Sequence, residues 1–199
     1  MQQHLALLFS FFILSAQAAT VLAAKPYDVP DAYEIYSIVL AQDHHEGELL
    51  IADTTVPFQG CLQPRTDDSV DSAIEDYMKT NQKKWHLERQ LDTRLRYKLL
   101  SRKKIASLRK SGPTGKITWQ LPAGTLLYRF SAVGFNADKT VAFLQTEVIC
   151  GPNCIGRRVV VLQKANTQWI PIPDPSLCLI VPGVKRYRST CSLSGLLSL

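Results

Sequence analysis

Several signals of a known chemistry are missing from this sequence. It contains four histidines, but it has no His-Glu-x-x-His motif, no Gly-x-Ser-x-Gly nucleophile elbow and no glycine-rich phosphate-binding loop. The motifs of zinc proteases, α/β-hydrolases and P-loop nucleotidases are therefore absent. Low-complexity segments and internal repeats are also absent, so a repeat architecture is excluded. The motifs predict no catalytic residue, no cofactor-binding residue, no metal ligand and no cofactor.

Charge is missing from the N-terminus. Residues 1–24 contain no Asp, Glu, Lys or Arg, and they form an apolar run that ends in small residues. This pattern is typical of a secretory signal peptide, with cleavage after Ala18 or Ala24. The alternative is an uncleaved membrane anchor. Because no later stretch is long and apolar enough to span a bilayer, membrane contact is expected only through this segment, if it stays uncleaved.

A signal peptide predicts a secreted or periplasmic location for the rest of the chain. Removing 24 of the 199 residues leaves 175, which suits one domain with its own core. We therefore predict a single domain over residues 25–174. A tail over residues 175–199 follows it and contains Cys178 and Cys191.

Hydrophobic periodicity predicts an α+β fold, in which N-terminal helices pack on a mainly antiparallel β-sheet with a C-terminal β-meander. The predicted helices cover 30–42, 70–81 and the segment from a cap at Ser101 to a stop at Gly112; the predicted strands cover 48–54, 94–100, 125–135, 140–149, 157–164 and 168–172. Alternation along the last four strands predicts the core of one antiparallel sheet. Its predicted members are Phe135, Phe143, Val159, Val161 and Trp169.

Positive charge is concentrated in one stretch. Residues 83–110 contain eleven Lys or Arg and two acidic residues, whereas the whole chain has a net charge of +6. Within this stretch Arg94, Arg96 and Lys98 alternate with apolar residues, so a strand would place the three basic side chains on one face. This face is a candidate contact for an anionic surface or polymer, such as a glycan or phospholipid headgroups. The alternative is a solvated strand whose charges discourage edge-to-edge pairing. Nucleic acid is not predicted, because no aromatic stacking pattern accompanies the basic residues.

Cys150 and Cys154 are the one closely spaced pair among the five cysteines. A structural zinc site needs about four ligands, and a thioredoxin-type couple has two intervening residues at the start of a helix. Here Gly-Pro-Asn separates the cysteines and strand-like runs flank them, so we predict a structural disulfide across a turn. A redox couple and a metal site stay open as alternatives. The pairing of the others is undetermined: Cys61, Cys178 and Cys191.

Two further groups of polar residues are weaker candidates. The segment 43–48 contains two adjacent histidines, which would point to opposite faces of a strand, so we expect an exposed loop rather than a metal site. The acidic residues near 67–76 are expected to complement the dipole of the predicted helix. Two function classes follow. The first is a non-enzymatic binding or structural module that contacts an anionic partner. The alternative is an extracytoplasmic hydrolase that acts on an envelope or extracellular polymer through unidentified carboxylates.

Residues 131–172 resemble a block found in a family of secreted bacterial proteins. The block contains a Ser-x-Val-Gly-Phe-Asn turn, an alanine-containing strand, a closely spaced cysteine pair, a strand that ends in lysine and a terminal tryptophan. The matching positions are Ser131, Val133, Gly134, Phe135, Asn136, Ala142, Cys150, Gly151, Cys154, Val161, Leu162, Lys164 and Trp169. The family has no assigned activity, so the resemblance implies a secreted single domain and no mechanism.

Overall fold

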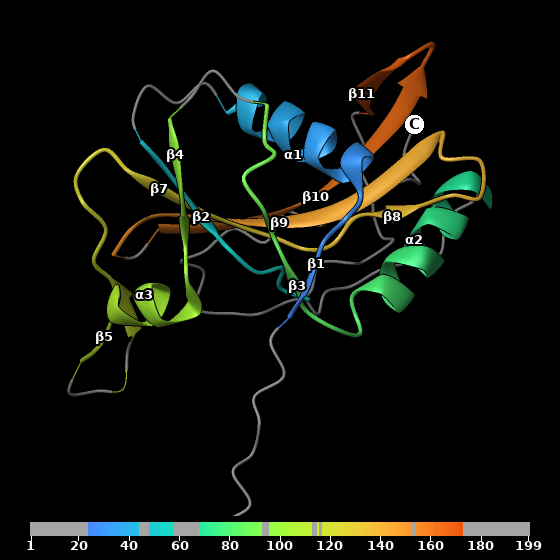
Figure 1. The fold of residues 1–199 in the computed structure, drawn as a ribbon. Coiled ribbons are helices and arrows are strands. Elements are labelled where there is room, and N and C mark those ends of the chain that lie inside the picture. Colours follow the sequence, from blue (N-terminus) through green and yellow to red (C-terminus); the bar gives the residue numbers. More distant parts are fainter. Residues whose placement is uncertain are drawn as a thin grey trace, which may run out of the picture.

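The computed structural model describes residues 24–43, 48–57, 68–92, 96–112, 115, 117–152 and 154–172. The predicted tail and nearly all of the predicted signal peptide lie outside these ranges. The described part has an α+β fold that is rich in strand, which confirms the coarse fold prediction (Figure 1). Within it, no helix has the length and apolarity needed to cross a membrane.

A seven-stranded mixed sheet forms the centre of the fold. Its strand order is β11-β10-β9-β7-β2-β4, and β8 pairs with β9 beside β7. The strands are β2 (Leu49–Ala52), β4 (Tyr97–Leu100), β7 (Leu126–Phe130), β8 (Gly134–Phe135), β9 (Val141–Gly151), β10 (Cys154–Ala165) and β11 (Gln168–Ile172). The strands from β7 to β11 pair antiparallel, as the predicted meander requires, whereas β2 is parallel to both β4 and β7.

Three helices and two small strand pairs complete the described fold. The helices are α1 (Pro30–Gln42), α2 (Asp68–Thr80) and α3 (Arg102–Ser107); the small pairs join β1 (Lys25–Pro26) to β3 (Trp85–His86) and β5 (Arg109–Ser111) to β6 (Ile117–Trp119). Proline in the first turn of α1 and acidic residues in the first turn of α2 agree with the predicted helix starts. The predicted third helix was too long, because residues 109–111 pair with β6 instead of continuing the helix.

Hydrophobic side chains from the two faces of the sheet form separate clusters. Figure 1 shows α1 over one face, and α2 and α3 on the other side. The α1 face buries Tyr36, Leu40, Phe130, Leu144 and Leu162, among others. The opposite face carries two clusters. One contains α2 with Phe143 and Val161, and the other contains Leu50, Trp119, Leu127 and Ile149.

The five predicted core residues all lie in the main sheet, but they divide between its two faces. Phe143, Val161 and Trp169 are buried, whereas Phe135 and Val159 are partly buried. Trp169 and Phe135 belong to the α1 cluster, and the other three belong to the α2 cluster. The sheet is therefore covered on both sides, which alternation along single strands does not reveal.

The predicted strand 125–135 is interrupted, and this expectation was wrong in one detail. Phe130 pairs with Thr146 and Gly134 pairs with Phe143, so three residues (131–133) lie opposite two (144–145). Such a bulge changes which face each following side chain occupies. It turns Gly134 toward α2 and Phe135 toward the α1 face.

Side chains in α1, just before α1 and just after α2 hydrogen-bond the backbone of this interruption. The Asn81 side-chain amide donates to the Ala132 carbonyl (3.1 Å) and its oxygen accepts from the Ala132 N–H (2.9 Å). The Tyr27 hydroxyl bonds the carbonyl (3.3 Å) and the N–H (2.9 Å) of Val133, and the Tyr36 hydroxyl donates to the Ser131 carbonyl (2.7 Å). The backbone groups that leave the ladder thus find partners inside the core.

Candidate functional site

The predicted basic strand corresponds to β4, which lies at an edge of the main sheet. Lys98 is exposed, but its ammonium pairs with the Glu48 carboxylate at 2.8 Å. Arg96 is exposed and directly precedes β4, and Arg94 lies outside the described residues. Because Glu48 offsets Lys98, the described part of β4 is a weaker positive surface than the alternation predicts.

The stronger positive surface begins at α3, which follows β4 after Ser101. The Ser101 hydroxyl caps the helix by accepting from the Lys104 N–H at 3.3 Å. Ile105 and Leu108 are partly buried and pack against the cluster around Trp119. These two apolar contacts fix the helix on the sheet, so its three consecutive basic residues are exposed: Arg102, Lys103 and Lys104.

The β5–β6 hairpin packs next to α3. The Gln120 N–H donates to the Leu108 carbonyl at 2.8 Å, and Arg109 pairs with Trp119 across the hairpin. The Arg109 guanidinium lies 5.4 Å from the centre of the Trp119 ring, in cation–π range. Trp119 itself is buried in the sheet cluster, so the hairpin is anchored at this end.

We call α3 together with the β5–β6 hairpin, residues 101–112 and 117–120, the basic lobe. Its described cations are all exposed: Arg102, Lys103, Lys104, Arg109 and Lys110. None of them forms an ion pair with a described carboxylate. Lys83 and Lys84 are also exposed but lie at β3, away from α3 (Figure 1). Among the described residues, the largest group of cations without an ion pair to a described carboxylate therefore lies on the lobe rather than on β4.

The sequence does contain a signal for this lobe. No Asp or Glu occurs between Asp92 and Asp138, although this interval contains many Lys and Arg. The count of Lys and Arg over residues 83–110 includes the cations of the lobe. The alternation of basic and apolar residues, however, predicts a basic face only over residues 94–100. The absence of acids over the longer interval would have identified the lobe, because neighbouring segments could not neutralise it.

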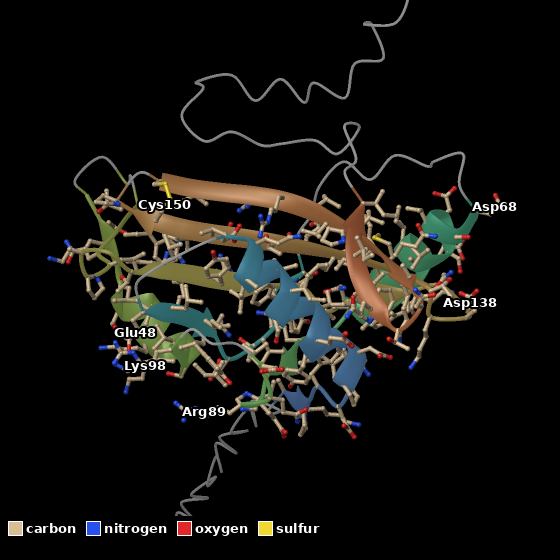
Figure 2. The ribbon with its side chains drawn as sticks, turned by 90° about the horizontal axis from the view of Figure 1, so that it is seen from above. Glu48, Asp68, Arg89, Lys98, Asp138 and Cys150 are labelled. Atoms are coloured by element: carbon tan, nitrogen blue, oxygen red, sulfur yellow. A yellow bond between two sulfur atoms is a disulfide. The ribbon has the colours of Figure 1, made fainter. Side chains whose placement is uncertain are left out.

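The disulfide predicted between Cys150 and Cys154 is present at the tip of the β9–β10 hairpin, with a Cα–Cα distance of 5.1 Å. The described residues contain no group of three metal-ligating side chains. The Trp119 N–H donates to the Pro152 carbonyl at 3.4 Å. This contact joins the cross-linked turn to the basic lobe, and Figure 2 shows Cys150 and Lys98 at the same end of the molecule.

A row of three charged side chains crosses the sheet on the face that carries α2 and α3. Glu147 on β9 is paired in register with Arg129 on β7 and with Arg157 on β10. Its carboxylate is only 2% exposed, contacts the Arg129 guanidinium and accepts from the Arg157 Nε at 2.6 Å. Two guanidiniums around one buried carboxylate satisfy its oxygens, which is the arrangement of a structural ion pair.

A second polar network lies on the α1 face. Asp43, at the end of α1, accepts a bidentate pair of bonds from Arg158 (2.8 Å each) and one bond from the Tyr128 hydroxyl (2.7 Å). Burial and this contact with the carboxylate raise the pKa of Tyr128, so its hydroxyl stays protonated. The expectation of an exposed loop was wrong for Asp43, and the adjacent histidines lie outside the described residues.

These two networks bear on the hydrolase alternative, which needs two carboxylates that converge on one substrate. Glu147 lies on the α2 face of the sheet and Asp43 on the α1 face, because Arg157 and Arg158 are neighbours in a strand and point to opposite sides. The two carboxylates held by several partners therefore do not form a pair.

Comparisons with known proteins supply no function. No family model matches the chain, and neither a curated protein nor a solved structure shows significant similarity to it. The resemblance of residues 131–172 to secreted bacterial proteins therefore stays a prediction.

Proposed function

We propose that this protein is a non-enzymatic binding module that attaches to an anionic surface or polymer through its basic lobe. One observation carries the proposal: five exposed cations share a small lobe, and no described carboxylate pairs with them. Clustered charge of one sign destabilises the compact state, and an anionic partner gives a reason for it. Arg96 and Lys98 extend this surface toward β4, and the sequence predicts that Arg94 shares their face.

The rest of the described chain would serve as a scaffold for this surface. In this proposal the N-terminal helices pack on the sheet, and residues 25–174 act as one domain. The protein would be secreted or periplasmic after removal of residues 1–24. The Cys150–Cys154 disulfide supports this location, because disulfides persist in oxidising compartments.

Binding to an immobilised anionic polymer tests the proposal. Three variants each replace three cations with glutamine: Arg102, Lys103 and Lys104 on the lobe; Arg94, Arg96 and Lys98 around β4; and Lys83, Lys84 and Arg89 as a control. Since each Lys or Arg near an anionic surface contributes about 1 kcal/mol, we expect the lobe variant to lose roughly 100-fold in affinity. The β4 variant should lose less, because Glu48 already offsets Lys98.

The control variant has the same net charge as the other two and should bind nearly as wild type does. Wild-type binding should also weaken as salt rises, because exposed charges are screened over about 10 Å at 0.1 M. If wild type shows no salt-sensitive binding to any anionic material, the proposal fails and the charges serve solubility and protection of the sheet edge. Equal losses in all three variants would show a net-charge effect and also reject the lobe as the site.

A further inference from the structure

An exposed aliphatic side chain accompanies the charges of the basic lobe. Ile117, the first residue of β6, is 45% exposed. It pairs with Ser111 across the hairpin and shares a face with Arg109 and Trp119. Trp119 is buried against the sheet, whereas Ile117, two residues earlier on the same face, is left partly uncovered beside Arg109 and Ser111. Figure 1 shows this hairpin projecting outward at the end of the molecule, next to α3.

We propose that the anionic partner is a phospholipid surface, on which the lobe docks with its cations against the headgroups and Ile117 inserted among them. This inference rests on the proposed function and specifies its partner. It assigns the contact with phospholipid headgroups to the basic lobe, apart from any membrane contact through residues 1–24.

Two features favour a lipid surface over a soluble polyanion. An exposed isoleucine adds no favourable contact with a charged, hydrophilic polymer. A membrane–water interface, in contrast, takes up an aliphatic side chain between its lipid headgroups. The cations also lie on different elements of a projecting unit, with Arg102, Lys103 and Lys104 on a helix and Arg109 on the same face of the hairpin as Ile117; Lys110 lies on the other face. A broad negative surface can contact such a unit from one side, while a single polymer chain is better matched by a groove.

The distribution of charge along the molecule gives the docked protein an orientation. Lys98 lies at the end of the molecule that carries the lobe, whereas Asp68 and Asp138 lie at the opposite end (Figure 2). An anionic surface attracts the first end and repels the second. The lobe therefore faces the lipid, and the acidic end points away from it.

The test compares vesicles with a soluble polyanion. Sedimentation with vesicles of phosphatidylcholine, with and without phosphatidylglycerol, gives the membrane affinity, and heparin binding gives the polyanion affinity. The decisive variant is Ile117→Ser. Its matched control is Ile170→Ser, which changes a 50% exposed isoleucine on β11, at the other edge of the sheet from β4. Circular dichroism of each variant verifies that it is folded.

We expect wild type to bind vesicles only when phosphatidylglycerol is present. Ile117→Ser should bind them about tenfold more weakly, because it loses much of the transfer free energy of a buried isoleucine. The same variant should keep its heparin affinity, and Ile170→Ser should behave as wild type in both assays. Vesicle affinity that is unchanged in Ile117→Ser, or heparin binding without vesicle binding, overturns the lipid inference and leaves the proposed function intact. Salt-sensitive binding to neither material overturns both.

Discussion

Single residues in the Ser131–Asn136 segment have structural roles that can be tested. A Cβ added at Gly134 would lie 2.3 Å from the Ala73 carbonyl oxygen and 2.3 Å from the Tyr77 backbone nitrogen. Because both are main-chain atoms of α2, the helix would have to move. We expect Gly134→Ala to destabilise the protein by about 1–3 kcal/mol or more in denaturant unfolding, as overpacking does.

Gly156 provides the matched control for this substitution. It lies in β10, and a Cβ built on it meets no atom within 4 Å. Gly156→Ala should therefore leave the free energy of unfolding almost unchanged. Equal effects of the two substitutions would contradict the close approach of β8 to α2. They would also contradict a structural role for Gly134 in the segment 131–136.

Buried tyrosines make the free energy of unfolding depend on pH in the alkaline range. Tyr36 is fully buried, and desolvation raises the pKa of its phenol well above the ordinary value of 10.0. Burial raises the pKa of Tyr27 in the same direction. A raised pKa in the folded state means that the protonated phenol is favoured by folding. This contribution to stability is complete below pH 10 and is lost as pH rises above that value toward the folded-state pKa.

We therefore expect these tyrosines to ionise only as the fold is lost. Tyrosinate absorbance and far-ultraviolet circular dichroism, followed together in an alkaline titration, should change in one transition for the buried residues. Tyr36→Phe removes one of the phenols and should make the loss of stability with pH less steep. Ionisation of Tyr36 near pH 10 with the secondary structure intact would contradict the buried environment.

At the scale of elements, the β9–β10 hairpin connects the core to the basic lobe. Its disulfide closes a short loop, so replacing both cysteines with serine should cost near the low end of the typical ~2–4 kcal/mol. Hydrogen exchange should show the loss at the tip and at the Trp119 N–H, which donates to Pro152. Leu127 and Ile149 are paired in the sheet, and their backbone N–H groups should stay protected from exchange, because both side chains pack in the cluster around Trp119. Loss of protection throughout the sheet would contradict this local role.

The two edge strands of the main sheet differ in how pairing is discouraged. Lys98 on β4 and Arg96 before it place charge at one edge. At the other edge β11 contains Pro171, which has no N–H to offer to a further strand. The predicted protective role of the basic strand thus fits its position, and the proposed binding role is assigned to the lobe.

At the scale of the whole molecule, we predict export with cleavage after Ala18 or Ala24. Either site lies before Tyr27, the first buried side chain among the described residues, so processing would leave the described core intact. N-terminal sequencing of protein from the extracytoplasmic fraction should find Ala19 or Lys25 at the start. An intact Met1 on soluble cytoplasmic protein would contradict this prediction.

Several local elements and the disulfide could be predicted from the amino-acid sequence alone. The spacing of apolar residues and the proline at its start predict α1 over Pro30–Gln42. The turn at Asn166 falls between the predicted strands 157–164 and 168–172, and its φ of 57° is one that asparagine tolerates. Cys150 and Cys154 are near in sequence, so a single turn is enough to join them. All of these features depend on contacts between residues that lie close together along the chain.

The position of the described cations that lack ion pairs, and the covering of the sheet on both faces, depend on contacts between distant parts of the chain. Lys98 met Glu48 because β4 pairs with β2, a contact across the chain that no local pattern contains. The predicted third helix ended early because residues 109–111 found partners in β6. The bulge that turns Gly134 toward α2 is stabilised by Tyr27 and Asn81, which are far from it in sequence. Long-range pairing sets these features, since it selects among local conformations of similar free energy.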